Sequence, residues 1–442
     1  MSDFSRRSFF AAGLSGLAAA HSFAQAPTSV FGSASDEAPF APSTLFLTWH
    51  RDPTTTMTVQ WVGTRGETSD TTVYYRPVKF TLPPADASLI GPALALSGAG
   101  WKPQKATVHG YHPSTDLKVF RAEINGLTPG TDYEFKVGKQ SPTYRFATMP
   151  AKATDAIHFV SGGDCGVNAH AVANNIQAAR QDPMFAVIGG DLAYDNGKSV
   201  ATNLAFLRNY SKHMVGKNGR LIPMLAGIGN HEVDGGYGTK REKAPFFYSL
   251  FDSFYPDTGY ATLDFGEYLS LIFLDTGHTS AIGGDQTDWL ERELKERKDH
   301  PHVIVVNHVP AYPSARSMEG AKGKAGTGEE NRKHWVPLFE KYRVPVVLEH
   351  HDHTFKRTKP LIDGTANDNG VLYLGDGSWG RLRSLQKPEK LAVMAATNQD
   401  YHLSLHRLQG DERFHLALDE NGRVMDAARS GQRKADAIPV AR

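Results

Sequence analysis

The sequence predicts an α/β layered domain that follows a smaller all-β sandwich. Apolar and polar residues alternate with period two through residues 44–148, whereas from 156 onward short apolar runs are separated by helical segments. The chain of 442 residues, with 40% hydrophobic and 21% charged residues, is longer than one hydrophobic core usually organises and has ordinary globular composition. We therefore expect two domains.

The first 26 residues are typical of a twin-arginine signal peptide. Arg6 and Arg7 precede an Ala- and Gly-rich stretch, and Ala24-Gln25-Ala26 has the small residues that a signal peptidase recognises. We expect export through the twin-arginine translocase to the periplasm or the medium. Residues 27–43, rich in Ala, Pro and Ser, are predicted to be a linker or leading arm.

Charge and cysteine content exclude several classes of protein. The formal net charge is +1, and there is neither a basic stripe that would suit nucleic acid nor an apolar run long enough to span a bilayer. The single cysteine, Cys165, rules out a disulfide framework within the chain. We favour a small buried residue at this position over a nucleophile or a metal ligand.

The first domain, residues 44–148, carries strands and turns of a sandwich. Residues 56–62 alternate apolar and polar side chains, and residues 72–75 and 119–124 are rich in β-forming residues. The stretch from Leu127 to Phe135 resembles the turn-and-strand signature of fibronectin type III domains, in which Tyr133 would pack at a strand corner. A change of composition over residues 148–153 marks the domain boundary.

The second domain, predicted over residues 154–425 with a C-terminal tail at 426–442, contains seven apolar runs that are too short for helices. They are residues 157–160, 185–188, 221–228, 269–274, 303–306, 344–348 and 371–374. Residues 288–295 have apolar positions at helical spacing and a Glu291/Lys295 pair one turn apart, which predicts a helix.

Polar residues follow five of these runs, where each predicted strand ends. The sequences are Gly162-Gly163-Asp164-Cys165-Gly166, Gly189-Gly190-Asp191-Leu192-Ala193-Tyr194, Gly229-Asn230-His231-Glu232, Asn307-His308-Val309-Pro310 and Glu349-His350-His351-Asp352-His353. Loops beyond the carboxyl ends of parallel strands converge on the ligand site in open α/β sheets. Oxygen and nitrogen donors of this kind suit hard and borderline metal ions.

Two metal ions fit this set better than one. Its members are Asp164, Asp191, Tyr194, Asn230, His308, His351 and His353, too many for one four-coordinate site with an open position. Two aspartates and a tyrosinate would leave a trivalent and a divalent ion with residual positive charge after one hydroxide is added. An anionic substrate such as a phosphate ester is therefore expected, because two-metal sites suit in-line displacement at phosphorus.

The order of these motifs resembles the calcineurin-like metallophosphoesterases, and specifically the purple acid phosphatases. The resemblance extends through residues 289–294 and 308–312. It implies a β-sandwich flanked by helices (αββα) after the fibronectin type III-like domain. By this resemblance Fe³⁺ is held by Asp164, Tyr194 and His353, a divalent Fe, Zn or Mn ion by Asn230, His308 and His351, and Asp191 bridges the two ions.

The resemblance also assigns roles beside the metals. His231 is expected to point at the substrate phosphate, donating to a phosphoryl oxygen or protonating the leaving group, and Glu232 to orient His231 or the loop backbone. The expected reaction is hydrolysis of a small phosphomonoester by in-line attack of a metal-bound hydroxide, an acid phosphatase activity.

The sequence departs from the family at two places. His350, preceded by Glu349, stands where the family usually has glycine; it adds a potential ligand or acid, and for His350 we favour a structural role over one near the substrate. The loop at 314–331 lacks the histidine pair of plant members and has Arg316, Lys322 and Lys324 instead. It is either a mobile segment that offers cations to phosphate or a solvated loop.

Two other functions remain open at this point. A phosphodiesterase or nucleotide hydrolase would use the same scaffold, and Cys165 beside Asp164 keeps it in view because exported alkaline phosphodiesterases place a cysteine on iron. A binding or adhesion protein with a vestigial metal site is the alternative of a different class. The natural ester, the divalent metal and the oligomeric state are left undetermined.

Overall fold

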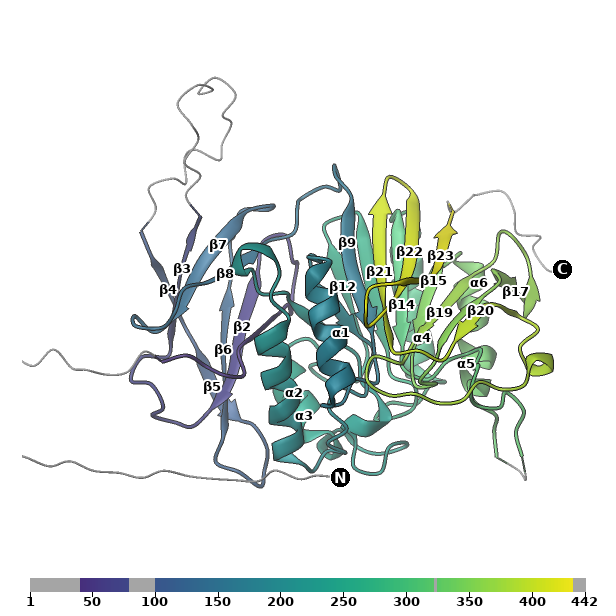
Figure 1. Cartoon of the computed structure of the whole chain (residues 1–442), viewed down its shortest axis with the longest axis horizontal. Coiled ribbons are helices and arrows are strands. Elements are labelled where there is room, and N and C mark those ends of the chain that lie inside the picture. Colours follow the sequence, from purple (N-terminus) through teal and green to yellow (C-terminus); the bar gives the residue numbers. More distant parts are fainter. Residues whose placement is uncertain (1–39, 79–99, 322–323, 432–442) are drawn as a thin grey trace, which may run out of the picture. The chain divides into compact units, whose positions relative to one another are not determined.

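The computed structural model describes residues 40–78, 100–321 and 324–431, which form an all-β sandwich followed by a mixed α/β domain (Figure 1). The predicted signal peptide and residues 27–39 of the predicted linker lie outside the described residues. Within the three described ranges, no helix has the length and apolar character needed to cross a membrane.

The first domain is built from two four-stranded antiparallel sheets, which confirms the predicted all-β sandwich. One sheet has the order β1 (Phe46–Thr48), β2 (Met57–Gly63), β6 (Lys118–Ile124), β5 (Thr107–Gly110). The other has the order β4 (Lys102–Lys105), β3 (Thr72–Pro77), β7 (Asp132–Val137), β8 (Tyr144–Ala147).

Tyr133 closes the corner that leads into β7. Its side chain is buried, its ring stacks on Phe146 at 5.1 Å, and its hydroxyl accepts a hydrogen bond of 2.9 Å from the backbone N–H of Thr128. The tyrosine therefore packs at a strand corner.

The α/β domain contains two larger sheets. The six-stranded sheet has the order β11 (Met224–Ala226), β10 (Ala186–Ile188), β9 (Ile157–Gly162), β21 (His402–Gln409), β22 (Glu412–Asp419), β23 (Val424–Ser430). The seven-stranded sheet has the order β12 (Ala261–Phe265), β13 (Leu269–Leu274), β14 (His302–Asn307), β15 (Val346–Glu349), β19 (Leu372–Asp376), β16 (Phe355–Thr358), β20 (Met394–Asn398). A small hairpin pairs β17 (Leu361–Ile362) with β18 (Thr365–Ala366).

Six α-helices lie among the described residues: α1 (Ala169–Arg180), α2 (Val200–His213), α3 (Pro245–Phe251), α4 (Asp285–Glu296), α5 (Glu329–His334) and α6 (Val336–Lys341). The helices α1 and α2, which follow the loops that contain Asp164 and Asp191, begin at side-chain caps. Asn168 accepts the N–H of Ala171 at 2.9 Å, and Ser199 accepts that of Thr202 at 3.3 Å. α4 contains the predicted helix 288–295.

Alternation along β13 shows how the layers are ordered. Leu271 and Phe273 belong to the core shared with the six-stranded sheet and with α1 and α2. Ile272 lies on the opposite face, where it packs in a second core with Leu290 and Leu294 of α4. Two sheets therefore face each other with helices outside both, and the predicted αββα arrangement is confirmed.

Buried polar contacts join the sandwich to the α/β domain. The guanidinium of Arg121 on β6 donates to Asp252 Oδ1 at 2.6 Å and to the carbonyl of Leu250 at 3.1 Å, and Gln60 Nε2 on β2 donates to the same carbonyl at 2.9 Å. Apolar side chains of both domains also belong to one continuous core. The sandwich is therefore packed as an integral part of the molecule.

The C-terminal strands differ from the expectation. We predicted that the second domain ends at residue 425, but β23 continues to Ser430 and pairs with β22. The reason is a buried polar contact at the end of β23: the Ser430 hydroxyl accepts from Arg413 Nε at 3.1 Å and lies 3.0 Å from His415 Nε2, so pairing with β22 extends to Ser430.

Candidate metal centre

Five strand ends bring the predicted donors together. β9, β10 and β11 run parallel in one sheet, and β14 and β15 run parallel in the other. The loops that follow them carry all seven predicted donors: Asp164, Asp191, Tyr194, Asn230, His308, His351 and His353. Contacts between these side chains divide them into two groups that meet at Asp191.

The first group consists of Asp164, Tyr194 and His353. The tyrosine hydroxyl lies 3.2 Å from Asp164 Oδ1 and 2.9 Å from His353 Nε2, and the last two atoms are 3.0 Å apart. The other oxygen of Asp164 accepts the backbone N–H of His351 at 2.7 Å, which leaves Oδ1 directed into the group. Three different donor types thus converge on one point.

The second group surrounds His308. Its Nε2 atom lies 3.2 Å from Asn230 Oδ1, 3.1 Å from His351 Nδ1 and 3.3 Å from Asp191 Oδ1. Its other ring nitrogen, Nδ1, lies 3.1 Å from the carbonyl of Gly189 and donates to it. That hydrogen bond fixes the ring so that Nε2 faces the group, as metal-ligating histidines require.

Asp191 lies within reach of both groups. One ligand atom from each of Asp164, Asp191, His308 and His351 lies within 4.8 Å of every other. Asp191 Oδ2 is buried and has no hydrogen-bond partner among the described residues. A buried carboxylate oxygen without a partner is costly, and a bound cation would satisfy it.

Protonation in the metal-free protein is consistent with cation binding. Burial alone would lower the pKa of His308, but the Asp191 carboxylate outweighs it and raises that pKa to about 9. Burial and the Asp164 carboxylate raise the pKa of the Tyr194 phenol far above its usual range. Protons therefore occupy positions that a metal ion would take over, because metal ligands bind in their deprotonated forms.

Backbone strain is concentrated in the same loops. Five of the seven donors have positive φ: Asp164 at 58°, Asp191 at 53°, Tyr194 at 64°, His351 at 67° and His353 at 58°. Left-handed backbone costs a residue with a side chain about 1–3 kcal/mol, and such residues cluster at functional sites. The strained backbone of these loops therefore places the donor side chains close together and costs local stability.

Glycines allow the loops to approach this closely. A Cβ at Gly229 would lie 2.4 Å from Asp191 Oδ1, one at Gly377 would lie 2.6 Å from Asp164 Oδ2, and one at Gly190 would lie 2.7 Å from His308 Nδ1. No other residue fits these three positions without displacing a donor. A binuclear metal centre fits three observations: the oxygen and nitrogen donors, the buried Asp191 Oδ2 without a partner, and the close approach of the loops at these glycines.

His231 lies beside the cluster. Its Nδ1 atom is 2.5 Å from Asn196 Oδ1, its Nε2 is 4.0 Å from Asp191 Oδ2, and 35% of its side chain is exposed. An amide oxygen only accepts, so Nδ1 carries a proton and Nε2 is left to face a ligand. The ring is also 4.3 Å from that of Tyr194.

Glu232 holds the loop backbone, one of the two roles that the sequence left open. Its carboxylate accepts the N–H groups of Gly229, Asp191 and Leu192, each at 2.7 Å. Burial and the nearby Asp191 carboxylate raise the pKa of Glu232 to about 8, whereas the N–H of Leu192 opposes that rise. Glu232 thus ties the Asp191 loop to the Asn230 loop.

His350 and Glu349 do not join the cluster. The buried His350 ring occupies the space above Gly163 and Gly189, and its Nδ1 lies 3.0 Å from the carbonyl of Asn307. Glu349 is fully buried, forms an ion pair with Lys356 and accepts the N–H of Ala311 at 2.6 Å. Glu349 therefore lies apart from the two donor groups, with its charge balanced by Lys356.

The predicted cationic loop is anchored at its start. Arg316 donates to the carbonyl of His351 and to Asp352 Oδ1 at 3.1 Å, so its guanidinium supports the last ligand loop. Lys322 lies outside the described residues.

Cys165 is 2% exposed and does not belong to the group of ligand atoms within 4.8 Å of one another. Its backbone N–H donates to the carbonyl of Asp191 at 3.0 Å.

Three residues near the cluster were missed from the sequence. Asn196 contacts His231, and Tyr237 places its hydroxyl 3.3 Å from both Asn230 Oδ1 and His351 Nε2. Arg381 lies with its guanidinium carbon 4.2 Å from the ring centroid of Tyr194. Each stands a few residues from a metal motif or in a glycine-rich loop, but neither position nor composition distinguishes it from a surface residue.

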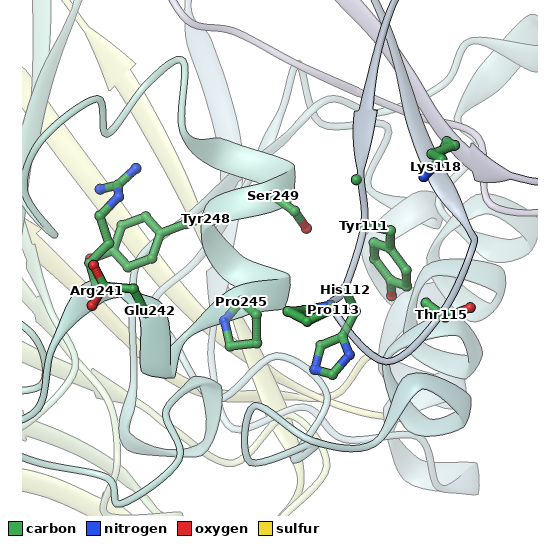
Figure 2. A pocket seen from close by; sticks show the side chains of 11 residues that line it. Tyr111, His112, Pro113, Thr115, Lys118, Arg241, Glu242, Pro245, Tyr248 and Ser249 are labelled. Atoms are coloured by element: carbon green, nitrogen blue, oxygen red, sulfur yellow. The ribbon is translucent and has the colours of Figure 1, made fainter.

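A separate hollow of about 640 Å³ lies between the sandwich and α3. Figure 2 shows Arg241 and Tyr248 on one side and Tyr111 and Lys118 on the other. The predicted metal donors do not line it, so it is distinct from the cluster. His112, also in its lining, has Nε2 3.3 Å from the carbonyl of Gly197, which follows the Tyr194 loop.

Two families of known proteins match separate parts of the chain, one over the sandwich and one over the α/β domain. Residues 42–148 match the family described as "Purple acid Phosphatase, N-terminal domain", and residues 157–355 match "Calcineurin-like phosphoesterase". These matches show that the chain carries the N-terminal domain of purple acid phosphatases followed by a calcineurin-like metallophosphoesterase domain, and the buried Asp and His donors lie in or next to the latter.

Similar proteins carry related names. Purple acid phosphatase 21 of Arabidopsis thaliana is 26% identical over 296 residues, covering 64% of this chain and 62% of that protein. Acid phosphatase type 7 of Homo sapiens is 25% identical over 425 residues, covering 87% of this chain and 90% of that protein. The chain thus spans about three fifths of the length of the Arabidopsis relative.

A solved structure supports the fold. The purple acid phosphatase PPD1 from yellow lupin (Lupinus luteus) seeds superposes with a TM-score of 0.68 at 14% identity, covering 88% of this chain and 74% of the lupin chain. At that identity the likeness concerns the fold, two antiparallel sheets followed by a mixed α/β metallophosphoesterase domain.

Proposed function

We propose that this metallophosphoesterase is a purple acid phosphatase-like enzyme, exported by the twin-arginine pathway, that hydrolyses small phosphomonoesters at a binuclear metal centre. The observation that carries the proposal is the arrangement of seven donors as two groups with Asp191 between them, one of its oxygens buried and unpaired. One ion alone would leave part of this set without a function.

The donors divide between the two ions by type. Asp164, Tyr194 and His353 would hold a trivalent iron, since a phenol of such high pKa gives up its proton only to a strongly charged cation. Asn230, His308 and His351 would hold a divalent iron, zinc or manganese ion, with Asp191 shared. When bound, the ions supply an activated water nucleophile and positive charge for the phosphoryl oxygens.

The protein's own groups prepare the reaction. Asn196 accepts from His231 Nδ1 and so leaves Nε2, 4.0 Å from Asp191 Oδ2, as the ring atom that would donate to a phosphoryl or leaving-group oxygen. Burial lowers the pKa of His231, so the cationic form that donates from Nε2 belongs to acidic medium. Glu232 holds the Asp191 and Asn230 loops in register through three backbone N–H groups. His308 is oriented by the Gly189 carbonyl.

Substrate preference is tested with one pair of compounds. On one iron-containing preparation, kcat/KM is measured across pH for an aryl phosphomonoester and its bis-aryl diester. A higher value for the monoester with an acidic optimum supports the proposal, whereas a higher value for the diester makes the chain a phosphodiesterase on the same scaffold. No turnover of either ester by fully metal-loaded protein would favour a binding protein and contradict the proposed reaction.

The Asp191→Asn variant tests whether Asp191 is shared by the two metal ions. It keeps the shape of the side chain but removes the charge that both ions would share, so metal content and turnover should both fall. Full activity in this variant would contradict the bridging role.

Export is tested separately. Replacing Arg6 and Arg7 by lysine should retain the protein in the cytoplasm if the twin-arginine translocase carries it. Unchanged export of the double variant would contradict this part of the proposal.

A further inference from the structure

The segment after β19 is tied to the ligand loops of the first donor group. The backbone N–H of Gly380 donates to the carbonyl of Asp164 at 3.1 Å, and that of Arg383 donates to the carbonyl of His353 at 3.0 Å. Asn168 also donates from its side chain to the carbonyl of Gly380 at 2.7 Å. Arg381, between these anchors, is therefore held beside Asp164, Tyr194 and His353.

The guanidinium of Arg381 lies over the ring of Tyr194. Its guanidinium carbon is 4.2 Å from the ring centroid of Tyr194, and a Cβ at Gly166 would lie 3.4 Å from its Nε and Nη2 atoms. A guanidinium over an aromatic ring is held there by attraction to the ring face, and its N–H groups remain available as donors. The lack of a side chain at Gly166 gives Arg381 room.

Arg381 has no anionic partner among the described side chains. Its Nε is buried without a hydrogen-bond partner, and none of its nitrogens forms an ion pair with a described carboxylate. Other partly buried arginines differ: Arg297 and Arg357 each make two hydrogen bonds to one carboxylate, those of Asp264 and Asp426. A guanidinium held in place without a counter-ion beside a cluster of phosphoesterase donors is arranged to meet an anion.

The surroundings add apolar surface. Val167 and Leu382, the chain neighbours of Gly166 and Arg381, are 36% and 39% exposed, and Tyr237 on the side of Asn230 and His351 is 47% exposed. These are three of the six large hydrophobic side chains that are exposed in the described part of the chain. Exposed apolar side chains therefore occur in the chain segments on both sides of the donor cluster.

We propose that Arg381 binds the substrate's phosphoryl group and sets the preference for phosphomonoesters over diesters. The inference rests on the proposed phosphoesterase function. A monoester carries three non-bridging oxygens and a diester only two, with an alkoxy or aryloxy group in place of the third. Arg381 supplies a charged donor for that third oxygen, and the same contact would bind inorganic phosphate, which carries it as well.

Arg381→Met tests this inference because it keeps an unbranched stem over the Tyr194 ring while removing the charge and all donors. On the metal-loaded enzyme, kcat/KM for the aryl monoester should fall about 10- to 100-fold, the range for a lost charge-assisted hydrogen bond. The value for the diester should change less than about 3-fold, within the range of a neutral contact. Arg407→Ala, which removes an exposed arginine on β21, is the control for net charge.

A binding measurement gives a readout besides turnover. Calorimetric titration of the metal-loaded enzyme with inorganic phosphate should show a dissociation constant raised by a similar factor in Arg381→Met, while that for dimethyl phosphate stays near the wild-type value. If Arg381→Met does not fold, Arg381→Lys is used, which keeps the charge but not the planar donors and should retain part of the discrimination.

The two proposals fail in different ways. An equal loss for monoester and diester in Arg381→Met, or unchanged phosphate binding, would overturn the role of Arg381 while wild-type turnover leaves the phosphatase assignment intact. Absence of turnover in the wild-type enzyme would overturn the proposed function itself. Retained discrimination in both Arg381 variants would also overturn the inference.

Discussion

Gly189→Ala should break the packing under the ligand loops, and removal of the His350 ring should repair it. A Cβ at Gly189 would lie 1.9 Å from His350 Cε1, 2.1 Å from Nδ1 and 2.5 Å from Nε2. The nearest contact is about 1.5 Å shorter than an ordinary van der Waals separation. The φ of Gly189 is not positive, so the backbone itself accepts alanine and the clash acts alone.

The magnitude follows from what has to move. Overpacking of this kind costs about 1–3 kcal/mol, and displacing the ring also breaks its contact with the Asn307 carbonyl, worth about 1 kcal/mol. We expect Gly189→Ala to lower the free energy of unfolding by about 3 kcal/mol. Because the Gly189 carbonyl orients His308, metal affinity should fall as well, by about 10- to 100-fold.

A double-mutant cycle measures the effect. Unfolding by urea and metal content by mass spectrometry are determined for Gly189→Ala, His350→Ala and the double variant. Since the added methyl group fills space that the lost ring vacates, the double variant should be about 2 kcal/mol more stable than the two single losses predict. Gly110→Ala, where an added Cβ meets nothing within 4 Å, is the control. Additive losses, or a Gly189→Ala protein as stable as wild type, would refute the packing argument.

Three further predictions concern the centre, the sandwich and the core. Tyr194→Phe should abolish any visible charge-transfer absorption of the iron-loaded protein while leaving its circular dichroism unchanged; an unaltered spectrum would contradict the tyrosinate assignment. Tyr111→Phe leaves Asn203 Oδ1 without its buried donor, so thermal unfolding should show a loss of about 1–2 kcal/mol, and an unchanged melting temperature would contradict this. Burial and Arg413 lower the pKa of His302 to about 4, so its contribution to stability is present above pH 6.5 and is lost as pH falls toward 4. His302→Gln should therefore flatten the urea-derived stability profile in that window by up to about 1.4 kcal/mol per pH unit, and a profile as steep as wild type would contradict the shift.

The Tyr111 contact also indicates what the sandwich contributes. Asn203, which accepts from Tyr111, donates to Asp195 Oδ2 at 2.7 Å, and Asp195 Oδ1 accepts the N–H of Gly197 at 2.7 Å. Through this chain of contacts the first domain supports the loop that begins at Asp191. Loss of turnover in Tyr111→Phe with unchanged metal content would be consistent with such support.

Several central strands of the α/β domain were predictable because burial on both faces requires a continuous run of apolar residues, which is visible in the sequence. The run 269–274 coincides with β13, and the run 303–306 lies within β14. The run 221–228 overestimates β11, which covers only Met224–Ala226, since the flanking apolar residues are buried in loops. The strands β21 to β23 were not predicted; their sequences mix His, Arg and Glu with apolar residues, and buried networks such as Ser161–His406–His415 satisfy those polar groups only after folding.

The sequence by itself determined the order of the domains, the strand ends and the types of donor atom placed there. These are local properties: a short apolar run ends at glycine, and an Asp, Asn or His follows at a fixed spacing. Only the tertiary structure decided that His350 fills the space over two glycines, that Lys356 neutralises Glu349, and that Arg381 lies on the Tyr194 ring. Such outcomes depend on which distant side chains compete for the same buried space or charge, and that competition is settled only when the two sheets pack together.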